Sequence, residues 1–414
     1  MDFLPTTLGT RPRLAVELRP EGVVAARAED AQALLSAVAY GVLAEGTVVP
    51  GLKLGNIAVR AAALAAVRKV LEAVALRDRR VTMILPDGAV RVLLLDFDQL
   101  PAKAAEALPV VRFRLKKLLP FDAEEAVVSY QVMSTSRGLV QVLAVAIPKD
   151  VLGEYESLVR EAGFEPGAVL PSTLAACAGL ALTDTAELLV NAGETSVTTA
   201  IVKGGVLLLH RTVDLAAEGL QEAVEEPTAP TGSMLEIPVE LLAGFQERDP
   251  LSSTGSDGFT KERSQTETRG GYEAQHADRG GTAATFGASR HAGEFAAEAR
   301  DGDARSPRAE MLPQLPTWSE TEQRRLTAAA REVTQAVSVA AAYFEDTLAA
   351  APGLVLSAGT MGAEALGTLL REAGFSREEM HVKELLEPVM LTGGAVSARV
   401  PHGWMAGVRG ALRS

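Results

Sequence analysis

The sequence predicts an α/β protein organised as two domains. Its 414 residues exceed what one hydrophobic core usually organises. Hydrophobic residues make up 47% of the chain but aromatic residues only 4%, so the expected core is built from Ala, Val and Leu, as in layered α/β proteins and helical bundles. Segments with strand periodicity are mixed with amphipathic helical segments along the chain, which favours the α/β class.

The first elements are strands and a helix. Residues 13–28 predict a hairpin whose turn is Pro20-Glu21-Gly22. An Ala-rich amphipathic helix is expected near residues 57–73, because its apolar positions recur at helical spacing. Two further strands are expected on either side of Pro86-Asp87-Gly88.

The next region predicts two helices with strands between them. The segment "AKAAEALPVVRFRLKKLL" predicts a helix that Pro109 should end or kink, because proline removes a helical hydrogen bond. Strands are expected in "PFDAEEAVVSYQVM" and in "LVQVLAVAIP", with a turn at residues 136–138 between them. Gly163 is the expected C-terminal cap of the helix "KDVLGEYESLVREAGF".

The second half contains a hairpin at 188–213, in which Lys203-Gly204-Gly205 joins two alternating strands. From 225 to 317 the composition turns to Gly, Ser, Thr, Glu and Arg, which cannot bury enough apolar surface to offset chain entropy, so a long disordered insertion is expected. Its apolar stretch at 234–245 is either a short helix, a docking motif or a chance apolar patch. A long helix, the strand "GLVLSA", the loop Gly359–Gly362 and the helix "AEALGTLLREAGF" are expected after it.

Charge limits the classes of function. The formal net charge of −13 argues against a general affinity for nucleic acid, which needs clustered Lys and Arg. One basic cluster lies on a predicted helix, where a solvated helix face is the favoured interpretation. It consists of Arg112, Arg114, Lys116 and Lys117.

The remaining composition predicts a soluble, cytoplasmic protein. The lone Cys177 excludes a disulfide framework within the chain and reads as a buried small hydrophobe. No stretch approaches the length of a membrane-spanning helix, and "MDFLPTTLGTRPR" lacks the apolar core of a signal peptide. The five histidines show no metal-ligand spacing, so no metal centre is expected.

Several longer segments together resemble a known family. They are "LPFDAEEAVVSYQVM", "VAIPKDVLGEYESLVREAGFEPGAVLPSTLAACAGL", the hairpin 188–213 as a second phosphate loop, "VLSAGTMG" as an adenosine-side glycine loop, and the C-terminal run Ala406–Arg413. Their order resembles the PilM family of type IV pilus assembly proteins, within the actin-like (ribonuclease H-like) ATPase superfold that also includes FtsA. The resemblance covers nearly the whole chain apart from the insertion.

The resemblance implies a domain plan. It expects a first actin-like domain in residues 1–182, with an extra lobe at about 85–165. The second domain is expected in residues 183–224 and 318–397, on either side of the disordered insertion 225–317. The last segment, 398–414, is expected to form a helix that returns to the first domain. Trp404 and Met405 are therefore expected to pack on the first domain, rather than to insert into a membrane as in related FtsA proteins.

The resemblance also implies where a nucleotide would bind. Nucleotide-binding members use an acidic residue at the end of the first strand for the metal, followed by a phosphate turn, a second phosphate loop and an adenosine-side loop. The corresponding residues here are Glu17, Gly22, Asn191, Gly193, Glu194, Gly359 and Gly362.

Departures from the family pattern argue against ATP hydrolysis. The extra methylene of Glu17 moves its carboxylate by roughly 1.5 Å, and Mg²⁺ tolerates little misplacement. Pro20 removes a backbone donor, and Glu21 brings a negative charge toward a triphosphate. Asn191 stands where the family has an aspartate, and Glu194 adds another negative charge. No cofactor is expected, and ATP with Mg²⁺ would bind only if the nucleotide cleft is retained. The glycines of the two loops, Gly193, Gly359 and Gly362, also suit tight turns that bind no ligand.

The predicted function is that of a cytoplasmic scaffold without catalysis. By resemblance, it would bind the cytoplasmic tail of a PilN-like inner-membrane protein and connect it to other pilus assembly components, so it would be peripheral to the inner membrane. The groove is expected near Leu119, Pro120, Phe121 and Tyr130. Two alternatives are a nucleotide-switched actin-like ATPase of the same machinery and a GspL-like cytoplasmic component of type II secretion.

Overall fold

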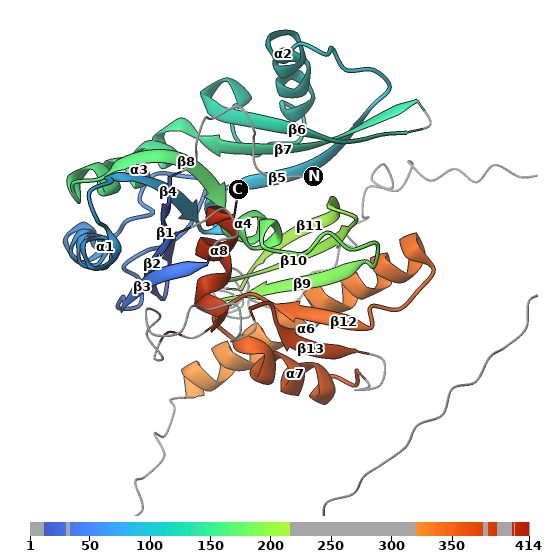
Figure 1. Cartoon of the computed structure of the whole chain (residues 1–414). Coiled ribbons are helices and arrows are strands. Elements are labelled where there is room, and N and C mark those ends of the chain that lie inside the picture. Colours follow the sequence, from blue (N-terminus) through green and yellow to red (C-terminus); the bar gives the residue numbers. More distant parts are fainter. Residues whose placement is uncertain are drawn as a thin grey trace, which may run out of the picture. The chain divides into compact units, whose positions relative to one another are not determined.

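The computed structural model describes most of the chain outside the expected insertion (Figure 1). It describes residues 12–29, 34–136, 138–215, 320–375, 380–386, 400 and 402–413, without the side chains of 320–325 and 402. The described elements belong to one compact unit formed by Met1–Glu226 and Thr317–Ser414. The insertion predicted at 225–317, with its apolar stretch 234–245, lies outside the described residues.

The first sheet has the strand order β3-β2-β1-β4-β8. Its strands are β1 (Leu14–Arg19), β2 (Gly22–Ala28), β3 (Leu35–Val42), β4 (Arg80–Leu85) and β8 (Glu165–Pro171). The first three strands pair antiparallel, whereas β4 pairs parallel with both β1 and β8. Helices α1 (Arg60–Val74) and α3 (Lys149–Glu161) cover one face of this sheet.

Side chains alternate along β1, and both of its faces are buried. Leu14, Val16 and Leu18 point into the core with α1 and α3. The intervening residues, among them Glu17, therefore point to the opposite face. That face is covered by α4 (Ser172–Ala178) and α8 (His402–Leu412).

The second sheet has the order β11-β10-β9-β12-β13. Its strands are β9 (Glu187–Ala192), β10 (Ser196–Lys203), β11 (Val206–Asp214), β12 (Leu354–Ser357) and β13 (His381–Glu384). Helices α6 (Glu320–Leu348) and α7 (Gly362–Glu372) cover one face. The predicted hairpin turn is present: φ is +57° at Gly204 and +75° at Gly205, the positive values that a tight two-residue turn requires.

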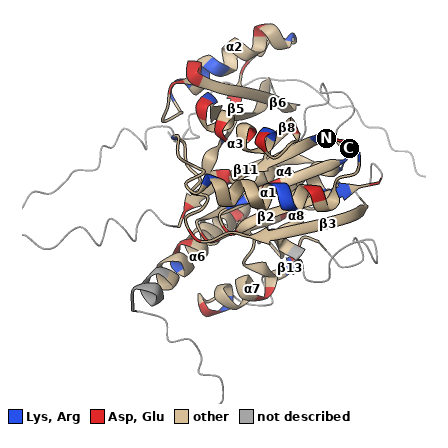
Figure 2. Cartoon of the chain, turned by 90° about the vertical axis from the view of Figure 1, so that its left-hand side faces the viewer, with Lys and Arg blue, Asp and Glu red and all other residues tan. Residues whose placement is uncertain are grey.

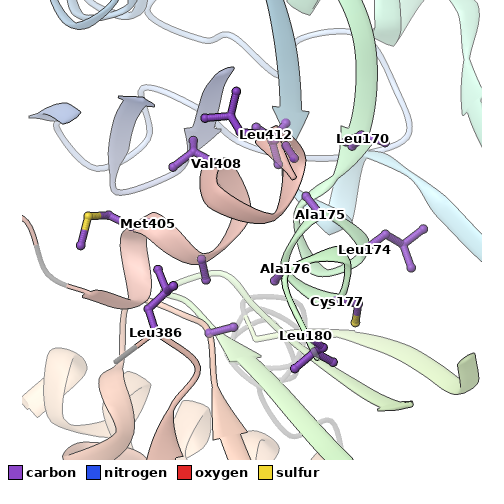
Figure 3. Packing of buried hydrophobic residues seen from close by; sticks show 14 of the residues in the cluster. Leu170, Leu174, Ala175, Ala176, Cys177, Leu180, Leu386, Met405, Val408 and Leu412 are labelled. Atoms are coloured by element: carbon purple, nitrogen blue, oxygen red, sulfur yellow. The ribbon is translucent and has the colours of Figure 1, made fainter. Parts of the chain in front are cut away.

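Helices α4 and α8 share one core with both sheets. Leu174 and Ala175 of α4 and Met405 and Val408 of α8 belong to a buried cluster that also contains side chains of β1, β2, β9 and β10 (Figure 3). The ring of Trp404 packs edge-on against Tyr40 of β3, with centroids 5.6 Å apart. The C-terminal helix is thus buried against the first sheet, with Trp404 only 8% exposed.

A smaller antiparallel sheet with the order β5-β7-β6 forms the extra lobe. It consists of β5 (Arg91–Phe97), β6 (Ala126–Ser136) and β7 (Leu139–Pro148), and α2 (Ala104–Leu115) packs on it. Short 3₁₀ turns precede β5 (η1, Asp87–Ala89) and β6 (η2, Ala123–Glu125).

Pro109 does not end its helix. It lies inside α2, which continues to Leu115. The carbonyl that loses its hydrogen-bond donor belongs to Ala105, which is exposed to water, and the buried side chains of Val111 and Leu115 hold the following turn on the sheet. Of the two predicted effects of Pro109, an end or a kink, the structure therefore contradicts the end of the helix.

No helix among the described residues is long and apolar enough to cross a membrane.

Candidate functional site

Two of the positions expected to bind a nucleotide, Asn191 and Gly193, line one cavity, whereas Glu17, Gly22, Glu194, Gly359 and Gly362 do not. The β1–β2 turn, η1, the start of α4 and the β9–β10 turn surround a small polar cavity of about 30 Å³. Its lining consists of Arg19, Pro20, Glu21, Pro86, Asp87, Ser172, Asn191, Gly193, Thr195 and Ser196. This cavity has the volume of about one water molecule, whereas small-molecule pockets usually measure about 300–1,000 Å³.

Glu17 forms an ion pair with Arg19, which lies two residues further along β1 and on the same face of the strand. Its Oε1 lies 2.7 Å from Arg19 Nη2 and accepts a hydrogen bond of 2.6 Å from Ser172 Oγ. Glu17 is fully buried and Arg19 is 5% exposed. Burial raises the pKa of Glu17, while the Arg19 charge and the Ser172 hydrogen bond act in the opposite direction and the charge of Asp87 adds to the rise.

Helix α8 packs directly against this carboxylate. A Cβ on Gly407 would overlap Glu17 Oε2, so glycine is needed for the helix to approach β1. That oxygen is buried and has no hydrogen-bond partner. The acidic residue predicted for the metal is therefore enclosed by Arg19, Ser172 and α8.

Asn191 is a hydrogen-bond donor within a second cluster. Its Nδ2 donates to Thr173 Oγ1 at 3.0 Å, to Ser172 Oγ at 3.1 Å and to Asp87 Oδ2 at 3.3 Å. Asp87 also accepts hydrogen bonds from the Thr173 backbone N–H and hydroxyl, at 3.1 and 2.5 Å. An aspartate at 191 would set a second carboxylate against Asp87, so the amide suits this environment.

Glu21 lines the cavity and contacts Glu194 of the β9–β10 turn. Glu21 Oε1 accepts a hydrogen bond from the Glu194 backbone N–H at 2.5 Å and from Thr360 Oγ1 at 3.3 Å. Burial raises the pKa of the Glu194 side chain, and the charges of Glu21 and Glu45 raise it further. A polyphosphate would meet these negative charges with Arg19 as the cation within the cavity lining.

Packing within the chain explains why two of the predicted phosphate-side positions, 22 and 193, are glycines. A Cβ on Gly22 would lie 2.8 Å from the Trp404 ring and would overlap the Gly41 carbonyl oxygen. A Cβ on Gly193 would lie 2.7 Å from Glu21 Oε1. Both positions therefore exclude a side chain because of other residues of the chain.

The adenosine-side loop is packed in a similar way. A Cβ on Gly359 would overlap the backbone of Ala192, and a Cβ on Gly403 of α8 would overlap the Gly359 carbonyl oxygen. Gly362 has a φ of +75°, which favours glycine at the start of α7. This loop is thus held between β9 and the first turn of α8.

The cavity does not fit a nucleotide with its metal. Its volume of about 30 Å³ is too small for a phosphate chain, and Glu17 and Asn191 are bonded to other residues of the chain, Arg19, Ser172 and Thr173 among them. Within the described part of the chain, no group of three or more His, Cys, Asp or Glu side chains could hold a metal ion.

Asp87, Ser172 and Thr173 are site residues that the sequence did not reveal. Asp87 reads as a turn residue between two strands, and the two hydroxyl residues read as the start of an apolar helix. Their common signal is weak: Asp87 follows Pro86 after β4, and Ser172 and Thr173 follow Pro171, the last residue of β8.

A larger groove of about 370 Å³ lies beside α2 in the extra lobe. It is lined by Leu108, Pro109, Arg112, Phe113, Lys116 and Glu124. Phe113 is 69% exposed, so its ring offers apolar surface in this groove. The sequence did not single out this residue, because a lone aromatic residue on a predicted helix carries no specific signal.

The basic cluster is only partly a solvated helix face. Lys116 Nζ pairs with Glu124 Oε1 at 2.7 Å, and Arg112 donates to the backbone carbonyl oxygens of Ala123 and Ala126. These contacts tie α2 to η2 and build one wall of the groove. Acidic and basic residues are interspersed on the helices of this side of the molecule, rather than gathered in one basic face (Figure 2).

The residues predicted for partner binding lie next to this groove in the chain. Leu119, Phe121 and Tyr130 are half-buried and pack against the core of the lobe, while Pro120 is exposed. Their apolar surface is therefore partly used within the lobe.

No protein-family model matches this chain, and no curated protein matches it in sequence. Among solved structures, the "PilM-PilN type IV pilus biogenesis complex" aligns over 97% of this chain and 98% of its own, with a TM-score of 0.57 and 15% identity. The cytoplasmic domain of EpsL from the type II secretion system of Vibrio cholerae aligns over 51% of this chain and 75% of its own (18% identity, TM-score 0.33). The ethanolamine utilization protein EutJ from Carboxydothermus hydrogenoformans aligns over 98% and 91% (10% identity, TM-score 0.38).

The first of these similarities shows the fold, and the other two are too weak to support an argument. The predicted actin-like α/β fold is confirmed, and it is shared with the chain aligned from the PilM-PilN complex.

Proposed function

We propose that this chain, which has the fold of PilM, is a scaffold of the type IV pilus assembly machinery. It binds the cytoplasmic tail of a PilN-like inner-membrane protein, stays peripheral to that membrane through this partner, and does not hydrolyse ATP. The fold similarity to PilM in a complex with PilN supports the choice of partner. The observation that carries the proposal is the cleft between the sheets, whose polar residues are bonded to one another.

Two requirements of phosphoryl transfer support the proposed absence of hydrolysis. The reaction needs a metal ion and a positioned water molecule, each held by groups that are free to bind them. The Glu17 carboxylate is paired with Arg19 at 2.7 Å, and the Asn191 amide donates to Ser172, Thr173 and Asp87. With a cavity of about 30 Å³ beside them, these groups serve the fold.

We place tail binding at the groove beside α2, next to the residues Leu119 to Tyr130. Peptides dock by burying a few apolar side chains in a preformed groove, with polar contacts at its rim. Phe113, Leu108 and Pro109 offer the apolar surface, while the Lys116–Glu124 pair offers charges of both signs at the rim. The volume of about 370 Å³ is sufficient for a short apolar segment.

Titration of a synthetic PilN-like tail peptide into the purified chain tests this site. Phe113→Ala should weaken binding by about tenfold or more, because exposed aromatic residues in grooves supply much of the binding free energy. Leu76→Ala is the matched control, since Leu76 is 71% exposed just after α1 and lies outside the groove. Equal affinity of wild type and Phe113→Ala would refute this location, and no binding to the wild type would refute the partner.

Calorimetric titration with ATP and Mg²⁺ tests the nucleotide part separately. We expect neither binding nor phosphate release. Micromolar binding that is lost in Gly193→Asp would instead support the nucleotide-switched alternative.

A further inference from the structure

Glu21 joins three loops that are far apart in the sequence. It lies in the β1–β2 turn of the first sheet, and its Oε1 accepts the Glu194 backbone N–H at 2.5 Å and Thr360 Oγ1 at 3.3 Å. Glu194 belongs to the β9–β10 turn, and Thr360 to the loop between β12 and α7. One carboxylate oxygen therefore connects the first sheet to two loops of the second.

The donors around Glu21 are of the kind that bind anions in proteins. A backbone N–H in a turn of small residues, with a hydroxyl beside it, can hold a phosphate or a carboxylate. Hydrogen bonds to an ionised acceptor are about twice as strong as neutral ones. Glu21 is only 8% exposed, so this interaction is shielded from water, unlike a surface contact.

The same carboxylate explains the glycine at position 193. Gly193 is not among the described residues with positive φ, so its backbone does not require glycine. An added Cβ would lie 2.7 Å from Glu21 Oε1, whereas the next atoms, Glu21 Cδ and Ser196 O, would be at ordinary distances of 3.7 and 3.8 Å. Glu21 Oε1 is thus the atom that excludes a side chain there.

We propose that Glu21 is the resident anion of this cleft. Its carboxylate takes the place that the surrounding loops would offer to a phosphate group, and it holds the two sheets together without a ligand. Because Glu21 is part of the chain, it competes with free anions at an effective concentration in roughly the millimolar range or above. This inference goes beyond the proposed function, since it holds whether or not the chain binds a PilN-like tail.

A double-mutant cycle tests the contact between Glu21 and Gly193 in the full chain. Gly193→Ala should lower the melting temperature of the wild type by about 4 °C, because its methyl group displaces the Glu21 carboxylate. In the Glu21→Ala background the same substitution should change the melting temperature by less than about 1 °C. An equal loss in both backgrounds would overturn the proposal, because another atom would then exclude the methyl group.

Rescue by a free anion tests the site itself. Formate at about 50 mM, compared with chloride at equal ionic strength, should raise the melting temperature of Glu21→Ala but not that of the wild type. Glu165→Ala, which removes an exposed carboxylate at the start of β8, is the matched control and should behave as the wild type does. A Glu21→Ala protein that folds but does not respond to formate would overturn the anion site.

A milder variant covers the case in which Glu21→Ala does not fold. Glu21→Gln keeps the shape and one oxygen acceptor but loses the charge, and it should lower the melting temperature by about 2 °C. An unchanged or higher melting temperature would overturn the proposal.

Discussion

Replacing Arg19 by methionine should strongly destabilise the protein, because it leaves the buried Glu17 without its cation. Methionine has a similar length but no charge. Glu17 is fully buried and lies 2.7 Å from Arg19, and removing one partner of such a pair costs about 3–5 kcal/mol of unfolding free energy. Arg19 also donates hydrogen bonds to Ser172 and Asn191, at 3.4 and 3.5 Å. Because these hydrogen bonds are long, losing them adds little to the destabilisation.

The penalty should depend on pH. The Arg19 charge lowers the pKa of Glu17 against the effect of burial, so its removal raises that pKa further. Below the raised pKa the carboxyl group is neutral and its burial costs less. The loss of stability in Arg19→Met should therefore be smaller at about pH 5 than at about pH 8.

Urea unfolding followed by circular dichroism measures both effects. Arg160→Met is the matched control: Arg160 pairs with Glu156 at the same distance of 2.7 Å, but its side chain is 58% exposed. This control should cost about 0.3–0.5 kcal/mol, with little change between the two pH values. If Arg19→Met costs less than about 1 kcal/mol at both, the pair does not hold the cleft in the way described.

Three further outcomes are expected. Gly407→Ala should destabilise the chain by about 1–3 kcal/mol, because its methyl group would overlap Glu17 Oε2. Gly153→Ala in α3, where a Cβ meets nothing within 4 Å, should instead stabilise the chain by up to about 1 kcal/mol. Urea unfolding of both variants measures these changes, and changes of the same sign would contradict the prediction. The folded-state pKa of Glu17 is raised above 4.5, so the contribution of Glu17 to stability is complete below pH 4.5 and is lost as pH rises through the folded pKa. The unfolding free energy of the wild type relative to Glu17→Gln should therefore fall over that pH range. A constant or rising difference would contradict this prediction. Cys177 is 1% exposed, and burial raises the pKa of its thiol. A thiol reagent should therefore modify Cys177 only when urea unfolds the chain. Stoichiometric modification of the native protein would contradict this and show that the core opens.

Local patterns were sufficient for the elements with strong signals. The turn at Gly204 and Gly205 and the amphipathic helices α3 and α7 are where the sequence predicts them, because glycine pairs and helical periodicity act over a few residues. The strands β3, β8 and β13 were not predicted. β8 carries a glycine and two prolines, and it is a strand because it pairs with β4 at the edge of the first sheet.

The sequence named positions for a nucleotide site but not the contacts that these residues make. Asn191 and Gly193 line one cavity, while Glu17 and Glu194 contact the lining residues Arg19 and Glu21. The partners Asp87 and Ser172 begin the short helices η1 and α4, and the sequences there carry only a weak signal. The paired residues are far apart along the chain, 155 positions for Ser172 and Glu17 and 173 for Glu194 and Glu21, and a local pattern cannot reveal such contacts.

The sequence by itself determined the α/β class, the aliphatic core and the replacement of family residues at the phosphate loops, because these depend on composition and on short spacings. Only the tertiary structure decided what the replacements do. Packing brings α8 onto Glu17 and the β9–β10 turn onto Glu21, and burial then makes each carboxylate find a partner within the chain. A charged side chain in a turn carries no such information until the fold removes the water around it.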